Sequence, residues 1–130
     1  MNTVQFLSVE WAETYRELWN ATPTTRDGTK ELDMLIEWRV PDGRAAQIDI
    51  KQGEAVYGGA PLPERKPDFI LTATTAVWKK VATGEISAGN AIMTRKIKFV
   101  GPVKVAMSHM PALSRGLTLA GEVDGLEWDN

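Results

Sequence analysis

The stretch from Pro67 to Leu113 constrains most strongly what this chain can fold into. Its pattern predicts a buried strand, two short helices separated by a Thr-Gly-Glu stop, an alternating strand and a Met-rich helix. The stretch offers no pairing of a nucleophile with a base and no cluster of metal ligands, whereas apolar side chains are abundant. We therefore expect a protein that holds an apolar molecule without transforming it and that needs no cofactor.

The composition narrows the class of protein. A chain of 130 residues is long enough for one domain with a sizeable core. We expect that domain to span residues 1–130, with its core at about 8–120 and a tail at 121–130. The net charge of −2 argues against nucleic-acid binding. There is no cysteine, no signal-peptide pattern at the N-terminus and no apolar run of the roughly 20 residues that span a bilayer. These features predict a cytoplasmic protein.

Hydrophobic periodicity sets the order of the predicted elements. Apolar residues recur at helical spacing in the first segment and then alternate, which marks the change from helix to strand. Hydroxyl residues that can cap helices, and glycine or proline that can end them, set the boundaries. The predicted order is a helix from Ser8 to about Asn20, a polar loop at 22–30, strands at 34–40, 46–50 and 55–57, an inner strand at 69–73, a helix capped by Thr74 or Thr75, a helix capped by Ser87, a strand at 96–100, and a last helix opened by Gly101-Pro102 and interrupted by Pro111.

This order predicts an α+β fold, in which one sheet is covered on one face by helices. The first and last helices are the obvious covers. The opposite face of the hairpin is expected to be wet, so that Glu37 and Asp49 face water and pair with charges across the hairpin, near Arg39 and Lys51. The acidic tail is expected to be loose, although Trp128 could fold back onto the domain.

Polar residues give little support for catalysis. The single histidine, His109, lies beside methionine and proline and has no carboxylate at ligand spacing, which favours a partly exposed surface position. No Gly-x-Ser-x-Gly motif is present. Five cations gather in one region, where they form either a solvated face or a surface attracted to an anionic membrane. These cations are Lys79, Lys80, Arg95, Lys96 and Lys98.

The chain resembles the sterol-carrier-protein-two domain family over roughly residues 32–117. A Pro-Asp pair, Pro67-Asp68, opens the inner strand, and a short helix that contains Trp78 ends at Gly84. A small helix follows, and then a strand of the Gly-Lys-Leu-Lys-Ile-x-Gly type, which here reads Arg-Lys-Ile-Lys-Phe-Val-Gly from Arg95 onward. The chain departs from the family where Arg95 replaces glycine and where Pro111 interrupts a terminal helix that is often continuous.

The resemblance implies a five-stranded, mostly antiparallel sheet covered on one face by helices, with an apolar tunnel between them. It also implies non-covalent binding and intracellular carriage of apolar lipids, such as fatty acids, fatty acyl-CoA and sterol-like or isoprenoid molecules, with no catalytic residue and no metal. Inward-facing positions matched to that architecture give the predicted lining: Ile36, Trp38, Ile48, Trp78, Val81, Ile92, Phe99, Met107, Met110, Leu113 and Leu117.

Two other functions stay open on the sequence alone. In one, the pocket is filled and the domain is an accessory module that docks on a lipid- or quinone-metabolising enzyme. A cavity below about 300 Å³ would favour that module, since ligand pockets are usually larger. In the other, Glu37, Asp49 or His109 forms an active site, which would require two of these groups to converge on one apolar cleft. We rank the lipid carrier first.

Overall fold

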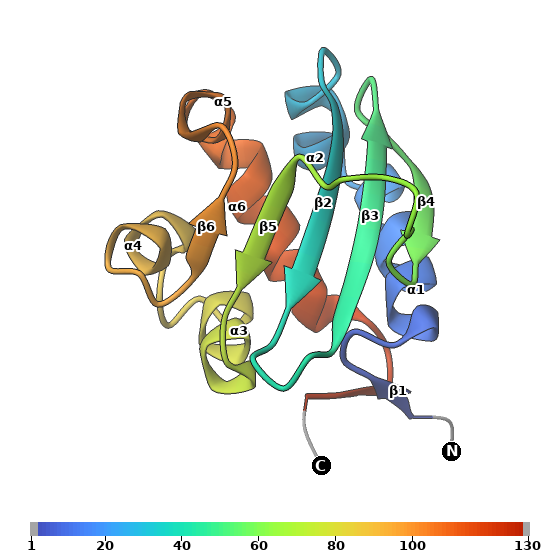
Figure 1. Cartoon of the computed structure of the whole chain (residues 1–130), viewed down its shortest axis with the longest axis vertical. Helices are drawn as coiled ribbons and strands as arrows, with labels where there is room; N and C mark the ends of the chain where they lie inside the picture. Colours follow the sequence, from blue (N-terminus) through green and yellow to red (C-terminus); the bar gives the residue numbers. More distant parts are fainter. Residues whose placement is uncertain (1–2, 129–130) are drawn as a thin grey trace.

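The computed structural model describes residues 3–128 of the chain. Its elements follow in an order that matches most of the sequence prediction (Figure 1). The strands are β1 (Val4–Gln5), β2 (Asp33–Arg39), β3 (Ala45–Lys51), β4 (Glu54–Gly59), β5 (Phe69–Thr72), β6 (Lys98–Val100) and β7 (Leu126–Glu127). The helices are α1 (Val9–Ala21), α2 (Pro23–Gly28), α3 (Thr75–Ala82), α4 (Ala88–Met93), α5 (Val103–Ser108), α6 (Met110–Leu119) and the 3₁₀ turn η1 (Ala120–Glu122).

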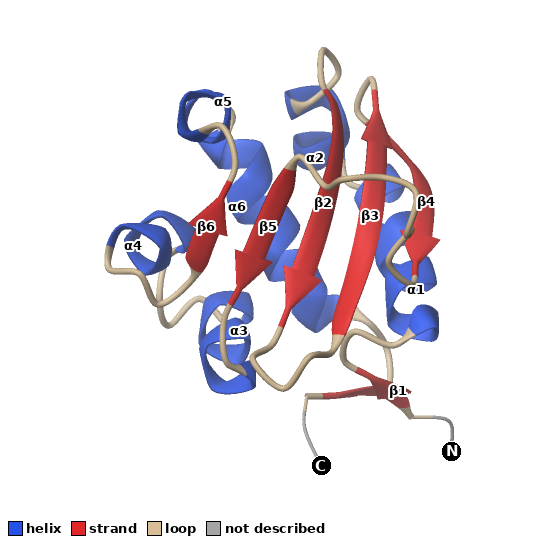
Figure 2. Ribbon diagram, in the orientation of Figure 1, coloured by secondary structure: helices blue, strands red, loops and turns tan. Residues whose placement is uncertain are grey.

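Five strands form one sheet in the order β4-β3-β2-β5-β6 (Figure 2). The β2–β5 pair is parallel and the other neighbours are antiparallel, so the five-stranded, mostly antiparallel α+β prediction is confirmed. The hairpin pairs Ile36 with Ile48 and Trp38 with Ala46, as the alternation in the sequence requires. This register turns the apolar side chains of neighbouring strands toward the same face.

Helices α1 and α6 lie behind the sheet in Figure 1 and bury its apolar face. Ser8 caps α1 as predicted, because its side chain accepts a hydrogen bond from the Trp11 N–H at 3.1 Å. The aromatic face of α1 meets the sheet at Trp38, whose ring centroid lies 5.4 Å from that of Trp11 and 5.2 Å from that of Tyr15. These large rings supply much of the apolar area that the two layers bury.

The prediction of a polar loop at 22–30 is wrong, because this segment contains the helix α2. Pro23 occupies the first turn, where its missing N–H costs no hydrogen bond. The buried hydroxyl of Thr25 donates to the Trp19 carbonyl at 2.8 Å, and the Thr29 hydroxyl donates to the Thr25 carbonyl at 2.7 Å. These two bonds satisfy polar groups that a solvated loop would have left to water.

The wet sheet face predicted for Glu37 and Asp49 is also wrong, since both carboxylates are buried. The loop at 60–68 crosses over this face between β4 and β5 (Figure 1) and brings Arg65 to within 2.6 Å of the Asp49 carboxylate. Glu37 forms an ion pair with Arg39 of its own strand, and Asp49 binds Arg65 of the loop and not Lys51, so neither of these pairs runs across the hairpin as predicted. Buried carboxylates require such partners, because an isolated buried charge is strongly unfavourable.

A side-chain amide ties the same loop to the sheet. Gln47 donates to the Glu37 carboxylate at 2.7 Å, and its amide oxygen accepts the backbone N–H of Leu62 at 2.9 Å. At the far end of the loop, the Asp68 carboxylate accepts the Leu35 N–H at 2.8 Å. The loop is therefore anchored on both sides, and this face of the sheet is closed by polar contacts.

The C-terminal segment packs against the N-terminus over its described part. Strand β7 pairs in parallel with β1, and the Trp128 ring lies 4.8 Å from the Phe6 ring. Trp128 thus folds back, and Val123 is buried in the core, where a loose tail had been expected. Residues 129–130 of the predicted tail lie outside the described residues.

Arg95 adopts a backbone conformation that favours glycine. It follows the C-cap residue of α4, Thr94, and has φ of 61°. A left-handed backbone costs a residue with a Cβ roughly 1–2 kcal/mol. Replacing that residue with glycine recovers only part of this cost, because glycine has more conformational entropy to lose on folding. We expect Arg95→Gly to raise the free energy of unfolding by about 0.5–1 kcal/mol in urea titrations. The neighbouring Lys96→Gly, which has no positive φ to relieve, should lower it, and equal losses in both variants would contradict this account.

Candidate functional site

An apolar cavity of about 30 Å³ lies between the sheet and helix α6. Six elements contribute to its wall, and almost all of the wall is hydrocarbon or aromatic carbon. The lining residues are Tyr15 and Trp19 of α1, Ile36 and Trp38 of β2, Phe69 and Leu71 of β5, Ile92 of α4, Phe99 of β6, and Met110, Leu113, Gly116 and Leu117 of α6.

Strand register produces the sheet side of the cavity. In the β2–β5 pair, Ile36 lies beside Phe69 and Trp38 beside Leu71. In the β5–β6 pair, Leu71 lies beside Phe99. Side chains of paired residues point to the same face of a sheet, so these five form one continuous apolar floor.

Helical spacing produces the opposite wall. Met110, Leu113 and Leu117 recur at intervals of three and four residues along α6, which places them on one face. Pro111 lies in the first turn of α6, and the chain leaves helical geometry at His109. The predicted interruption of the terminal helix is therefore confirmed, and it separates α5 from α6.

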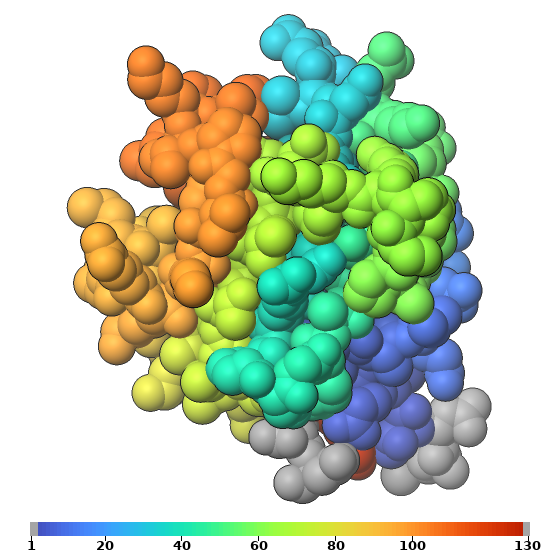
Figure 3. Space-filling view, in the orientation of Figure 1, coloured from blue at the N-terminus to red at the C-terminus, as the bar shows by residue number. Residues whose placement is uncertain are grey.

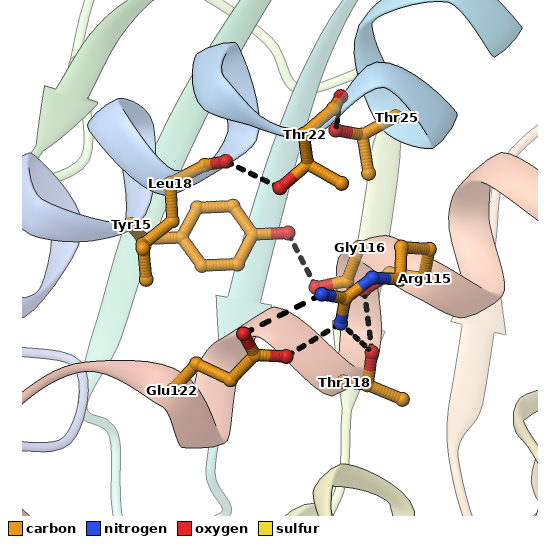
Figure 4. Close-up of polar contacts among 8 residues, drawn as sticks. All are labelled: Tyr15, Leu18, Thr22, Thr25, Arg115, Gly116, Thr118 and Glu122. Atoms are coloured by element: carbon orange, nitrogen blue, oxygen red, sulfur yellow. Dashed lines mark hydrogen bonds and ion pairs between the residues drawn. The ribbon is translucent and has the colours of Figure 1, made fainter.

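A glycine lets α6 approach α1 closely. A Cβ at Gly116 would lie 2.8 Å from the Trp19 ring and 3.2 Å from the Tyr15 hydroxyl, so any side chain there would be crowded. The Tyr15 hydroxyl instead donates to the Gly116 carbonyl at 2.7 Å (Figure 4). On the outer side of the same helix, Arg115 forms an ion pair with Glu122 at 2.5 Å. The hydrogen bond from Arg115 to the Glu122 carboxylate raises the pKa of the Arg115 guanidinium, so the guanidinium stays charged.

Few polar groups reach the cavity wall. Burial raises the pKa of the Tyr15 hydroxyl strongly, and the nearby Arg115 charge opposes this only in part, so Tyr15 stays neutral. The indole N–H of Trp38 is buried and has no hydrogen-bond partner within residues 3–128. The indole N–H groups of Trp11 and Trp19 do have partners, since they donate to the Ala120 and Gly53 carbonyls. The chemistry of the wall therefore suits hydrocarbon, with one donor left unused.

Seven of the eleven residues predicted to line a tunnel lie around this cavity. They are Ile36, Trp38, Ile92, Phe99, Met110, Leu113 and Leu117. Ile48, Trp78 and Val81 are buried elsewhere in the core, and Met107 is exposed on the surface of α5. Whether any of them contacts a ligand remains a prediction.

Five lining residues were not in the sequence prediction: Tyr15, Trp19, Phe69, Leu71 and Gly116. Two signals pointed to four of them. The aromatic face of α1 recurs at intervals of four residues, and the inner strand at 69–73 must turn alternate residues toward the helices. Gly116 carried no signal, because its role depends on how closely two helices approach.

A shallow groove of about 560 Å³ opens on the surface next to the cavity. Ile92 and Phe99 line both, so the groove and the cavity share part of their wall. Its remaining walls are formed by Arg95, Ile97, Lys98 and Val103. Two of the five predicted cations therefore lie in the groove, and all five are exposed.

The groups considered for catalysis do not meet at one site. Glu37 and Asp49 lie under the loop at 60–68, with Arg39 and Arg65 as ion-pair partners. The His109 ring instead lies 2.9 Å from the Val105 carbonyl at the end of α5. Within residues 3–128, no group of three or more acidic or histidine side chains is placed to hold a metal ion. Nor does this part of the chain contain a helix with the length and apolarity to cross a bilayer.

The buried tyrosine predicts a loss of stability in alkali. Tyrosine in the unfolded chain ionises near pH 10.0, while Tyr15 in the folded protein holds its proton to higher pH. The folded state then binds more protons, so the free energy of unfolding should fall above pH 10 by about 1.4 kcal/mol per pH unit from this group. Urea titrations from pH 8 upward measure this slope. Tyr15→Phe should flatten it, although the lost hydrogen bond costs about 1 kcal/mol at pH 8. Equal slopes in both proteins would contradict this account.

The sequence profile of the SCP-2 sterol transfer family matches residues 13–114. The chain belongs to this family. Membership implies a lipid-binding or lipid-transfer domain. No curated protein matches the chain in sequence.

Solved structures with the same fold support the assignment. A crystal structure of sterol carrier protein 2 has a TM-score of 0.80 and 21% identity, covering 90% of this chain and 98% of its own. The solution structure of TT1886 from Thermus thermophilus, described as possibly a sterol carrier protein, has a TM-score of 0.74 and 20% identity, covering 89% and 87%. The UbiJ-SCP2 ubiquinone synthesis protein has a TM-score of 0.61 and 10% identity, covering 91% and 93%. At these identities the structures show a shared fold.

Proposed function

We propose that this protein is a non-catalytic carrier that binds apolar lipids in the space between the sheet and α6. Fatty acids, fatty acyl-CoA and sterol-like or isoprenoid molecules all present the hydrocarbon that such a wall accepts. The observation that carries the proposal is the continuous apolar lining contributed by six separate elements, next to a groove that reaches the surface. Family membership supports the same class of ligand.

Ligand entry requires the cavity to widen. At about 30 Å³ it is roughly tenfold smaller than ordinary ligand pockets, so the tunnel implied by the resemblance is not open in this structure. The α6 side of the wall is suited to move, because its Met110 and Leu113 are only half-buried. The helix that precedes it, α5, is held weakly, since Ala106 is its buried residue. Methionine has several rotatable bonds and fills irregular space easily. We infer that the entering chain displaces α5 and these side chains.

The gain from burying a hydrocarbon chain is sufficient for such opening. A lipid that buries about 300–400 Å² of apolar surface gains about 7–12 kcal/mol before costs. Association, ordering and wall displacement remove much of this gain. The remainder corresponds to dissociation constants from about micromolar to nanomolar. Apolar walls distinguish shape and size rather than chemical identity, so we expect several lipids to compete for the space.

Displacement of a fluorescent fatty acid by palmitate tests the proposal. The delipidated protein should bind the probe with micromolar or tighter affinity, and palmitate should displace it, whereas a short soluble acid such as butyrate should not. Mass spectrometry of organic extracts from the freshly purified protein should identify co-purified lipid. Absence of both extracted lipid and probe binding at micromolar concentration would refute carriage.

The second candidate is an accessory module that docks on a lipid- or quinone-metabolising enzyme. The small cavity favours this function, since it falls well below the volume of an ordinary ligand pocket. The shared fold with a ubiquinone synthesis protein is consistent with it. The module predicts no displacement by palmitate and stoichiometric co-purification of an identified enzyme of that class. Probe binding that palmitate reverses would instead support the carrier.

A further inference from the structure

Exposed apolar side chains gather on the elements that flank the groove, from α4 to α5. Within residues 3–128, four of the six large hydrophobic residues that are exposed lie between positions 93 and 107, and their exposed fractions run from 50% to 78%. We call these four residues the apolar rim: Met93, Val100, Val103 and Met107. The other two, Val9 and Val56, lie on α1 and β4. Clusters of exposed apolar residues mark interaction surfaces, whereas scattered ones are ordinary.

The rim occupies one side of the molecule. Figure 1 shows α4, β6 and α5 along one margin, with α1 and β4 along the opposite margin. In the space-filling view, the orange chain of this region projects at that margin (Figure 3). Val103 belongs both to the rim and to the groove wall. A flat surface that meets the rim would therefore lie over the groove that adjoins the cavity.

Positive charge is interleaved with the rim. From Ile86 to Gly121 the sequence contains no aspartate or glutamate, although the whole chain has 17 acidic residues. Four exposed cations lie in the part of this segment that carries the rim, and within residues 3–128 none of them forms an ion pair with a carboxylate. These cations are Arg95, Lys96, Lys98 and Lys104. A carboxylate nearby in space, Asp68, is engaged by the Leu35 N–H.

We propose that the apolar rim and its cations form a docking surface for anionic lipid bilayers, with the rim side chains inserted among the headgroups. Apolar insertion combined with electrostatic attraction is the usual basis of reversible interfacial binding, because one signal alone is weak. Charge complementarity selects an anionic partner, and the exposed apolar side chains among the unpaired cations suit a bilayer, which offers headgroup charge above hydrocarbon. The proposal rests on the proposed carrier function for its purpose, because docking presents the groove to the source of the ligand.

Vesicle co-sedimentation with the full chain tests the docking surface. We expect binding to vesicles of phosphatidylcholine mixed with phosphatidylglycerol at least about tenfold tighter than to phosphatidylcholine alone, and a steep loss of binding as salt rises. Lys96→Glu combined with Lys104→Glu, neither of which lines the groove, should reduce binding to anionic vesicles about tenfold or more. The matched control, Arg44→Glu with Lys51→Glu, makes the same charge change on the β2–β3 turn and at the end of β3, away from the rim, and should change it less than about threefold.

A second pair of double variants tests the apolar side chains of the rim. Met93→Ser with Val100→Ser, neither of which lines the groove, should weaken vesicle binding about tenfold. Val9→Ser with Val56→Ser removes exposed apolar groups elsewhere and should leave it nearly unchanged. Thermal unfolding confirms that all four variants fold. Equal vesicle binding by the rim variants and their controls would overturn the proposal, as would equal binding to neutral and anionic vesicles.

Palmitate displacement without vesicles separates docking from carriage. Rim variants that bind palmitate normally but lose vesicle binding support the docking surface as a separate device. If the natural protein binds no palmitate yet still prefers anionic vesicles through the rim, the docking surface stands and the carrier proposal fails. If it binds palmitate but shows no rim-dependent vesicle binding, the docking proposal fails alone.

Discussion

Replacing Trp11 with alanine is expected to lower the free energy of unfolding by about 3–5 kcal/mol. The Trp11 side chain is fully buried, with its ring centroid 5.2 Å from Phe6 and 5.4 Å from Trp38. Its indole N–H donates to the Ala120 carbonyl at 3.2 Å, which ties α1 to the end of α6. The substitution removes this bond and leaves a cavity between the helical layer and the sheet. Urea unfolding followed by circular dichroism measures the loss.

Val9 offers a control on the same helix. It lies at the start of α1, where its side chain is largely exposed, so Val9→Ala should change the free energy of unfolding by less than about 0.5 kcal/mol. A loss after Trp11→Ala no larger than the loss after Val9→Ala would show that the aromatic cluster does not hold the two layers together.

Leu113→Asp is expected to weaken palmitate binding about a hundredfold, which corresponds to about 2.7 kcal/mol. Leu113 lines the cavity from α6 and is half-buried, so the carboxylate can stay hydrated while the space is empty. An entering hydrocarbon chain would have to strip that hydration without supplying a hydrogen bond. The loss should therefore appear in binding more than in folding, and displacement titrations of the fluorescent probe measure it.

The matched control for this charge is Val56→Asp. Val56 is exposed on β4, away from the cavity, so the same added carboxylate should change palmitate affinity less than about twofold. Thermal unfolding of both variants confirms that they fold. Palmitate affinity that is unchanged by Leu113→Asp would place the ligand somewhere other than the cavity.

The sheet and most helices could be predicted because their signals are local. Alternation through Ile36 and Trp38 fixes which residues of β2 face the helices, and the register of the β2–β3 hairpin follows from it. Ser8, Thr74 and Ser87 each cap a helix with the side-chain hydrogen bond that their position suggested. Each capping bond spans three residues, so the sequence pattern contains it.

The errors arise where distant segments decide the outcome. Glu37 and Asp49 occupy the polar positions of an alternating hairpin, and a solvated face and a face covered by a loop give the same pattern. Burial depends on the loop at 60–68, whose Arg65 lies 16 residues beyond Asp49. Helix α2 has only six residues, too short for intrinsic propensity to reveal it.

The size of the cavity was beyond prediction for a related reason. A packed core and a hollow one share the same apolar periodicity, since both turn hydrophobic side chains inward. Volume depends on how closely α6 approaches α1 at Gly116 and on the rotamers of Met110 and Leu113. The lining was therefore predictable as a set of inward positions, whereas the free space between them was not.

Isotope-filtered nuclear Overhauser spectra of the protein saturated with palmitate test most directly whether the chain of a lipid enters between the sheet and α6. The carrier account predicts contacts from palmitate methylene protons to the Phe99 ring and to the methyl groups of Leu113 and Leu117. Contacts confined to the exposed rim residues Met93 and Met107, with none to the interior, would contradict it.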